Sequence, residues 1–319
     1  MKKTAILLLC LVLAVLLPLN ALAKTPTEAE AYSRMIALKE DYPEGTPWTN
    51  DNFYAWNGGI YSGGYGCVAF AFLLSDAAFG TLPARMYTEI DYDSLRVGDI
   101  LRVNSDTHSV IILEKHSDHV VLAEGNYNRS VHWGRMLAKS EVLNANYYLT
   151  RYPLPEEITQ SGAVITADPG TQTAAVSSAA DPGATTVTIP ATVTTSDGTV
   201  CKVTEIAANA FKGMKKLQKV TIGKNVVTIG DGAFQKCTAL TAITLDKKVA
   251  KIGKNAFNGC KKLKTITIKT EKLKKDTIGK NCFKGIYAKA TFKCPKKMLK
   301  NYKAWFLKPG GAPKTAKFK

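Results

Sequence analysis

Residues with the side chains needed to hydrolyse an amide bond lie close together in the first half of the chain. Cys67 follows glycines at 63, 64 and 66 and precedes the run VAFAFLLSD, which is typical of a buried helix. His108 begins the strand-like run HSVIILEKH, and the next such run ends in Glu124-Gly125-Asn126. A thiol at a helix start, a histidine at a strand start and an acid–amide pair at a strand end indicate a cysteine hydrolase.

Each of these residues has a defined chemical task. The thiolate is the nucleophile, and a free cysteine has a pKa of about 8.5. The dipoles of a helix start and a histidine within reach would both lower the pKa of Cys67. His108 would act as the general base and then as the acid toward the leaving amine. The preceding glycines allow a tight turn and leave backbone N–H groups free to face a developing oxyanion.

The partner that orients His108 follows from an expected hairpin. Ser117-Asp118 form a short turn that pairs residue 116 with residue 119, so that His108 faces about residue 127. Glu124 and Asn126 have the same parity along their strand, and both side chains therefore point to the face where they flank His108. Either of them is a candidate to fix the tautomer of the histidine.

The elements that position these residues follow a predicted export signal. Two lysines, an apolar run over 5–19 and Ala21-Leu22-Ala23 predict a secretory signal peptide over residues 1–23. The apolar run is short for a membrane span, and no second run of this length follows, so we expect no membrane span. The mature protein is expected to be secreted, either extracellular or associated with the cell wall.

Residues 24–155 are predicted to form an α+β domain. Helices are expected near residues 28–38 and over 67–79. Strands are expected at 99–103, 108–115, 119–124, 131–137 and 147–152. Residues 156–186 are rich in Ala, Thr, Ser and Gly with two Asp-Pro-Gly turns, which predicts a flexible linker.

The chain repeats itself after this segment. Phe211, Phe234, Phe257 and Phe283 recur at intervals of 23, 23 and 26 residues, and Leu217, Leu240 and Leu263 recur at 23. A period this regular predicts a solenoid, because one such unit cannot bury its own apolar face. We place this leucine-rich-repeat domain, with its capping segments, at residues 187–308, followed by a basic tail at 309–319.

Charge divides the chain in the same way. Residues 201–319 contain 30 lysines, no arginine and 5 acidic residues, whereas residues 24–200 are acidic. Lysine without arginine or interleaved aromatic residues argues against nucleic-acid binding. It fits attraction to an anionic polymer. No cofactor or metal is expected, since His116 and His119 lack the carboxylate or cysteine cluster that would complete a site.

The repeats resemble the BspA-type leucine-rich repeats of bacterial surface proteins. The pattern I-x(3)-A-F followed by L-x-x-I-x-I/L covers roughly residues 187–294, and residues 187–203 look like an entry hairpin. The resemblance implies a β-solenoid that presents a surface for adhesion or anchoring. Within the repeats, Cys237, Cys260, Cys282 and Cys294 occupy positions where other repeats have apolar residues, so we interpret them as buried hydrophobic residues. A disulfide between Cys237 and Cys260 is the alternative.

Residues 53–152 resemble the CHAP family, a branch of the papain-like superfamily that includes the NlpC-type cell-wall peptidases. The matching motifs are Gly66-Cys67-Val68-Ala69-Phe70, Val97-Gly98-Asp99-Ile100, His108-Ser109-Val110 and Glu124-x-Asn126. The resemblance implies that Cys67 is the nucleophile, His108 the base, Glu124 its orienter and Asn126 a polar assistant. Tyr65-Gly66 stands where many members have a glutamine or aspartate, which leaves the oxyanion donor and the scissile bond open.

Two functions are therefore expected for this papain-like domain with a C-terminal leucine-rich-repeat β-solenoid. The first is a peptidoglycan amidase or endopeptidase that acts on bacterial cell-wall peptide or glycopeptide, with repeats that bind an anionic wall polymer or surface ligand. The alternative is a surface adhesion protein with an inactive papain-like domain. A secreted protease acting on proteins would share the same site.

Overall fold

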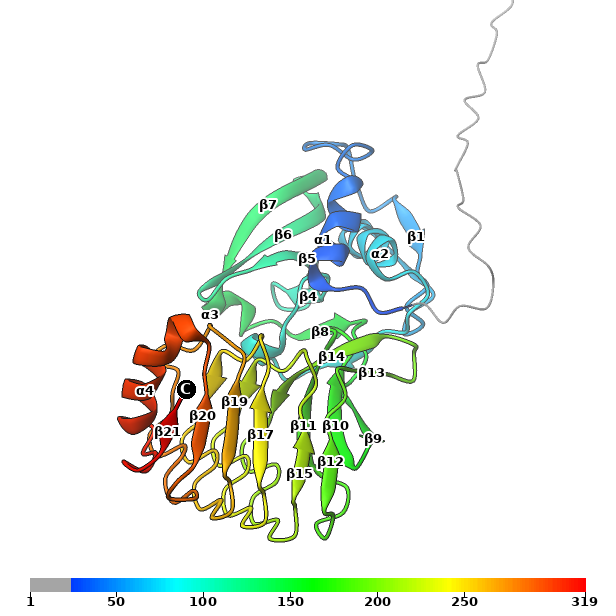
Figure 1. The fold of residues 1–319 in the computed structure, drawn as a ribbon. Helices are drawn as coiled ribbons and strands as arrows, with labels where there is room; N and C mark the ends of the chain where they lie inside the picture. The colour runs from blue at the N-terminus through cyan, green and yellow to red at the C-terminus, as the bar shows by residue number, and fades with distance from the viewer. Residues whose placement is uncertain (1–23) are drawn as a thin grey trace, which may run out of the picture.

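The computed structural model describes residues 24–319, and the predicted signal peptide at residues 1–23 lies outside this range. The chain forms an N-terminal part of helices and an antiparallel sheet, residues 24–155, and a long β-solenoid (Figure 1). No helix within residues 24–319 has the length and apolar character needed to cross a membrane.

Two helices cover one face of the N-terminal sheet. Helix α1 (Glu28–Ala37) begins at Thr27, whose side chain accepts a hydrogen bond from Glu30 N while the Glu30 carboxylate accepts one from Thr27 N. Helix α2 (Gly66–Phe79) is apolar on nearly every side and ends at Gly80, which has a φ of 61°. A helix with this composition must be buried, and α2 packs against β5 and β6.

The N-terminal sheet has six antiparallel strands in the order β3-β8-β4-β5-β6-β7. Alternating side chains fill two cores, one toward the helices around Phe70 and Ile111 and one on the opposite face around Leu101 and Val110. The strands of the N-terminal part and its third helix are β1 (Phe53–Ala55), β2 (Gly63–Tyr65), β3 (Arg85–Tyr87), β4 (Ile100–Val103), β5 (His108–Lys115), β6 (His119–Tyr127), β7 (Ser130–Ala138), α3 (Lys139–Val142) and β8 (Tyr147–Thr150).

The segment predicted as a flexible linker, residues 156–186, is ordered β structure instead. Strands β9 (Glu156–Gln160), β10 (Ala163–Asp168) and β11 (Thr173–Ala179) form an antiparallel meander, and β11 pairs in parallel with β14. Ala163, Ile165 and Ala167 are fully buried against the first coil of the solenoid. The prediction was wrong because the buried residues are mostly alanines, whose alternation with Thr and Ser resembles an unstructured polar stretch.

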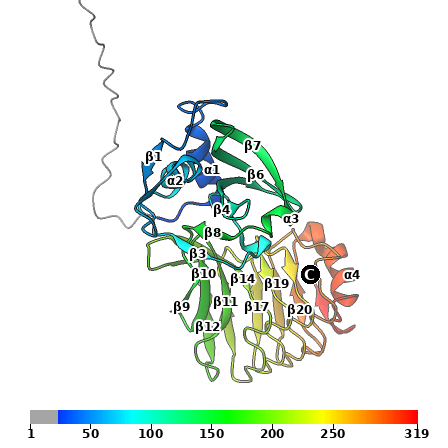
Figure 2. The same cartoon turned by 180° about the vertical axis from the view of Figure 1, so that it is seen from behind.

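The repeats form a solenoid with two mainly parallel sheets that enclose one core (Figures 1 and 2). The first sheet has the order β12-β15-β17-β19-β20-β21 and the second the order β18-β16-β14-β11-β10-β9, with β13 paired to β14. Their bounds are β12 (Thr186–Thr188), β13 (Thr192–Thr194), β14 (Val200–Ile206), β15 (Lys219–Thr221), β16 (Thr228–Ile229), β17 (Ala242–Leu245), β18 (Lys251–Ile252), β19 (Thr265–Ile268), β20 (Thr291–Lys293) and β21 (Lys317–Phe318).

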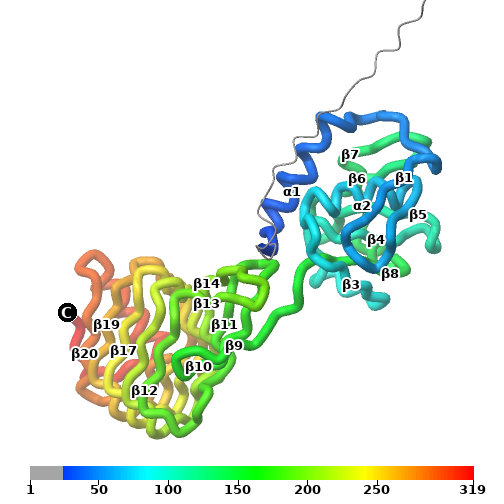
Figure 3. Tube along the Cα trace, turned by 90° about the vertical axis from the view of Figure 1, so that its right-hand side faces the viewer, coloured from blue at the N-terminus to red at the C-terminus, as the bar shows by residue number. Residues whose placement is uncertain are grey.

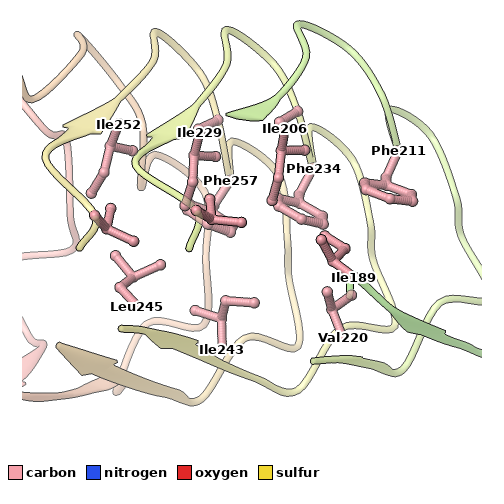
Figure 4. Close-up of a cluster of buried hydrophobic side chains, with 14 of the residues drawn as sticks. Ile189, Ile206, Phe211, Val220, Ile229, Phe234, Ile243, Leu245, Ile252 and Phe257 are labelled. Carbon is pink, nitrogen blue, oxygen red and sulfur yellow. The ribbon is translucent and has the colours of Figure 1, made fainter. Parts of the chain in front are cut away.

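Equivalent residues of successive coils stack into rows inside the solenoid. The rings of Phe211, Phe234, Phe257 and Phe283 lie parallel, with centroids 5.2, 5.3 and 5.4 Å apart. Figure 4 shows Phe211, Phe234 and Phe257 of this row beside the isoleucine row Ile206, Ile229 and Ile252. The thiols of Cys237 and Cys260 are free and donate hydrogen bonds to the carbonyls of Phe211 and Phe234. The interpretation of these cysteines as buried residues therefore agrees with the structure, which contains no disulfide in residues 24–319.

The predicted basic tail, residues 309–319, is part of the C-terminal cap. Helix α4 (Leu299–Leu307) places Tyr302 and Phe306 over the open end of the core, and Phe306 packs edge-on against Phe283. Strand β21 then adds to β20, and Phe318 stacks on Phe292 at 4.8 Å. The apolar end of the solenoid needs such a cover, and the high lysine content of the segment concealed this role.

The N-terminal part and the solenoid are in direct contact. Thr25, just before α1, is fully buried, and its hydroxyl donates a hydrogen bond of 2.6 Å to Asp197. Arg96 forms two hydrogen bonds with Asp168 at the end of β10, of 2.7 and 3.2 Å, and lies over the ring of Tyr152. Figure 3 shows the segment before α1 returning to the solenoid near β13 and β14.

Candidate active site

The thiol of Cys67 is carried to its position by a short hairpin and a tight turn. Strands β1 and β2 pair antiparallel, and α2 begins directly after β2. Gly66 has a φ of 59°, and a Cβ at this position would lie 2.5 Å from Asn50 Oδ1, so only glycine fits without strain. Tyr65, at the helix N-cap, provides no side-chain cap, which leaves N–H groups of the first turn beside Cys67 without a side-chain acceptor.

Cys67, His108 and Glu124 are brought together, although they come from α2, β5 and β6. The N–H of Ser109 donates a hydrogen bond of 3.4 Å to Cys67 Sγ, which places the thiol against the first residues of β5. His108 Nε2 lies 2.8 Å from Glu124 Oε2. Because Nε2 faces the carboxylate, Nδ1 is the ring nitrogen left for the hydrogen bond between His108 and the thiol. All three side chains are buried, Glu124 completely.

The protonation of this group favours an ion pair between thiolate and imidazolium. Burial raises the pKa of Cys67, but hydrogen bonds with His108 and Ser109 outweigh it, and the pKa falls below its ordinary value. Burial also opposes protonation of His108, yet its bonds with Cys67 and Glu124 raise the His108 pKa to about 9. The pKa of Glu124 is lowered despite burial by its bonds with His108 and Arg135. The lowered pKa of Cys67 and the raised pKa of His108 both favour transfer of the thiol proton to the histidine.

The cysteines of the solenoid contrast with Cys67. Burial raises the pKa of Cys201 and Cys294 to about 11 and that of Cys237 and Cys282 to about 12. Among the cysteines in residues 24–319, Cys67 alone has a lowered pKa and a histidine partner. It is therefore the one of these six thiols that is suited to nucleophilic chemistry.

Asn126 does not contact His108 but bonds elsewhere. Its side-chain N–H donates to Asn50 Oδ1 at 2.6 Å, and its φ of 57° turns the end of β6 away from the regular strand. The predicted register was also off by one residue, because a bulge lies between Ile112 and Glu114 and Ile111 faces Ala123. A second irregularity between Glu124 and Tyr127 turns Asn126 toward Gly66, and Glu124 alone binds His108.

Two residues near the site were not predicted from the sequence. Arg135 of β7 forms two hydrogen bonds with the Glu124 carboxylate, of 2.5 and 2.9 Å. Asn50, in the loop before β1, lies against Gly66 and pairs with Asn126. The sequence did offer one signal for Arg135. The predicted strand at 131–137 follows β6 and can pair with it, and Arg135 is the only arginine in that strand.

A cavity of about 320 Å³ lies near the start of α2, lined by Gly63, Gly64 and Val68 but not by Cys67 or His108. Tyr61, Phe72 and Tyr147 form its aromatic walls, and Arg102 contributes a charge. Ser109, whose N–H binds Cys67 Sγ, lines it as well. The cavity is thus connected to the thiol through Ser109 alone.

Comparison with known proteins identifies the second half of the chain. Residues 199–308 match the family model of the BspA type leucine rich repeat region in six copies. Residues 199–308 of the solenoid are therefore BspA-type leucine-rich repeats, as the sequence pattern predicted. The family model does not reach Cys67, His108 or Glu124, so the interpretation of these residues depends on their geometry.

Several solved structures are similar to the chain over part of its length. A leucine-rich repeat protein from Bacteroides capillosus has 28% identity and a TM-score of 0.35, covering 41% of this chain and 96% of that protein. One from Bacteroides ovatus has 33% identity and a TM-score of 0.30, covering 37% and 29%. A leucine rich cell surface protein from Faecalibacterium prausnitzii has 22% identity and a TM-score of 0.32, covering 44% and 45%. No curated protein matches the chain.

Proposed function

We propose that the chain is a secreted or surface-located leucine-rich-repeat protein whose N-terminal part hydrolyses amide bonds through Cys67. The observation that supports this most is the buried Cys67–His108–Glu124 group, in which the thiol pKa is lowered and the histidine pKa raised to about 9. Burial alone produces the opposite effect on the other cysteines of residues 24–319. Such an arrangement fits a nucleophile activated by an adjacent base.

The reaction follows from these positions. The thiolate of Cys67 attacks the amide carbonyl carbon, and the oxyanion forms near the start of α2, where the Cys67 N–H would donate to it. One such donor contributes about 3 kcal/mol in comparable sites. The imidazolium of His108 then gives its proton to the departing amine, which leaves an acyl group on Cys67. A water molecule, deprotonated by His108, attacks the thioester and releases the acid.

The substrate class that we propose is the peptide or glycopeptide of bacterial peptidoglycan. The resemblance to CHAP and NlpC-type cell-wall peptidases implies this class, and the cavity beside Ser109 offers a place for a substrate group. An amide of another protein would satisfy the same chemistry, and substrate profiling separates the two.

Digestion of purified peptidoglycan tests the proposal. The mature protein should release fragments, identified by mass spectrometry, and the Cys67→Ala variant should release none. The new ends of the fragments identify the bond cleaved. Equal release by both proteins would exclude Cys67 as the nucleophile, and no release by either would remove peptidoglycan as the substrate.

The repeats would hold the protein on an anionic wall polymer. Residues 201–319 carry 30 lysines against 5 acidic residues, and attraction of this kind weakens when salt screens it. We expect full-length Cys67→Ala protein to bind isolated walls in dilute buffer and to elute largely at about 0.5 M salt, where the Debye length is only a few ångströms. Retention that does not change with salt would contradict the electrostatic part of the proposal.

A second candidate function is that of a surface adhesion or interaction protein whose N-terminal part has no catalytic activity. The family match favours it, because the match covers the repeats alone. The reactivity of Cys67 distinguishes the candidates, since an inactive domain has no need of an activated thiol.

A further inference from the structure

Arg135 extends the row of contacts at the site by one more charged residue. Its Nε and Nη2 donate hydrogen bonds to the two carboxylate oxygens of Glu124. The same Oε2 atom is also hydrogen-bonded to His108 Nε2. Glu124 has no exposed surface, whereas the Arg135 side chain is 30% exposed. The carboxylate is therefore held between the imidazole on one side and the guanidinium on the other.

The charges along this row alternate in sign. A thiolate at Cys67, an imidazolium at His108, a carboxylate at Glu124 and a guanidinium at Arg135 add up to zero. Without Arg135 the same buried group would carry a net negative charge. A buried group tolerates charge only when it is paired, so losing the guanidinium disfavours the thiolate or protonates the carboxylate.

The other charged groups nearby do not replace Arg135. Arg102 of β4 lowers the pKa of Cys67, but its guanidinium is bound to Asp106 and Ser109. On β6, Tyr127 lies under Arg135 at 5.4 Å and beside His108, with ring centroids 6.1 Å apart.

Two groups from other elements also face this row. His132 of β7 contacts the edge of the Tyr127 ring. The hydrogen bond with Glu124 is the main cause of the raised Arg135 pKa, and the negative charge of Glu141 of α3 adds to it. Neither brings a cation to the Glu124 carboxylate, so Arg135 is the cation that binds it.

We propose that Arg135 is a positioning residue of the site, which holds the Glu124 carboxylate against His108 and balances its charge so that the thiolate–imidazolium pair can form. This role rests on the proposed function of Cys67 and His108 as nucleophile and base. Arg135 binds Glu124 and acts on the thiol through this carboxylate and His108.

The test is the pH dependence of Cys67 alkylation by iodoacetamide in the full-length protein, followed by peptide mass spectrometry. In Arg135→Met the midpoint of the rate profile should rise by about one pH unit, the size of shift that the loss of a close opposite charge produces. Arg135→Lys keeps the charge but only one of the two hydrogen bonds, and its midpoint should lie between those of wild type and Arg135→Met. Arg129→Met removes the same charge from the exposed β6–β7 turn and should leave the midpoint unchanged.

A folded Arg135→Met protein with the wild-type midpoint would overturn the proposal, because a merely structural role lowers stability without moving the profile. Near-ultraviolet circular dichroism establishes folding. If Arg135→Met does not fold, Arg135→Gln, which retains one donor but no charge, gives the same comparison. A wild-type Cys67 that reacts no faster in weak acid than the solenoid cysteines would overturn the proposed function itself, and this role of Arg135 with it.

Discussion

At the scale of single residues, Cys67 and the solenoid cysteines show how one side chain acquires opposite properties. All are buried or nearly so, and burial alone raises a thiol pKa, as it does for Cys237. Cys67 departs from this rule because His108 and the N–H of Ser109 bind its sulfur. The partners, rather than the exposure, therefore set its reactivity.

Replacing His108 by glutamine should remove most of this reactivity. The side chain keeps a similar size, but it cannot accept the thiol proton, so the Cys67 pKa should return to about 8.5 or above. Alkylation at pH 6 is expected to slow by at least about tenfold, measured by mass spectrometry of the Cys67 peptide. His119→Gln, at the opposite end of β6 from Glu124, is the matched control and should react like wild type. An unchanged rate in His108→Gln would show that the histidine does not activate the thiol.

The raised pKa of His108 also predicts a pH dependence of stability. A histidine whose pKa is about 9 in the folded protein stabilises the fold fully below its unfolded pKa of about 6.5. This contribution is lost as the pH rises through about 9. The unfolding temperature of wild type should therefore fall between pH 6.5 and pH 9.5 by more than that of His108→Gln. Equal decreases in the unfolding temperatures of wild type and His108→Gln would contradict the raised pKa of His108.

At the scale of elements, the sequence predicted α2 and β5 closely but not their alignment with β6. The run of apolar residues at 110–113 lacks the alternation from which a register is read, because both faces of the sheet are covered. The sequence therefore did not reveal the bulge between Ile112 and Glu114. It also did not reveal the irregularity between Glu124 and Tyr127 that separates Asn126 from Glu124. Arg135 was missed for a related reason, since its partner Glu124 lies on another strand.

Gly66→Ala tests the turn that begins α2. An alanine at a φ of 59° is strained, and its Cβ would meet Asn50 Oδ1 at 2.5 Å and Asn126 Nδ2 at 3.1 Å. We expect a loss of about 1–2 kcal/mol in the free energy of unfolding together with slower alkylation of Cys67. Gly59→Ala is the control: its φ is 85°, but no atom lies within 4 Å of the new Cβ. It should lose stability without slowing the alkylation, and equal alkylation rates in both variants would contradict the role of Gly66.

At the scale of the whole molecule, the period of the repeats predicted the solenoid because the same apolar positions recur in successive coils. The ends carry no such signal. The meander β9–β11 and the C-terminal cap each occur once and use small or lysine-rich sequences, which were interpreted as a linker and a tail. The contact between Arg96 and Asp168 joins the N-terminal part to the solenoid. These residues are 72 positions apart, so no local sequence pattern reveals their contact.

Two neighbouring substitutions in β10 test whether residues 156–186 are part of the solenoid. Ile165 is fully buried, so Ile165→Asp should cost about 3 kcal/mol or more, because an unpaired carboxylate enters the core. Thr166 lies on the other face of the strand, and Thr166→Asp should change the free energy of unfolding by about 0.5 kcal/mol or less. Thermal unfolding followed by circular dichroism measures both. Equally small changes in the free energy of unfolding for both variants would indicate that residues 156–186 are a flexible linker.

The central claim is that the protein carries one activated thiol. Brief treatment of the native wild-type protein with iodoacetamide at pH 6, followed by mass spectrometry of all the cysteine peptides, tests it most directly. We expect Cys67 to be alkylated at least about tenfold faster than Cys201, Cys237, Cys260, Cys282 and Cys294. A Cys67 that reacts as slowly as these five would contradict it and would leave a leucine-rich-repeat surface protein without a working cysteine site.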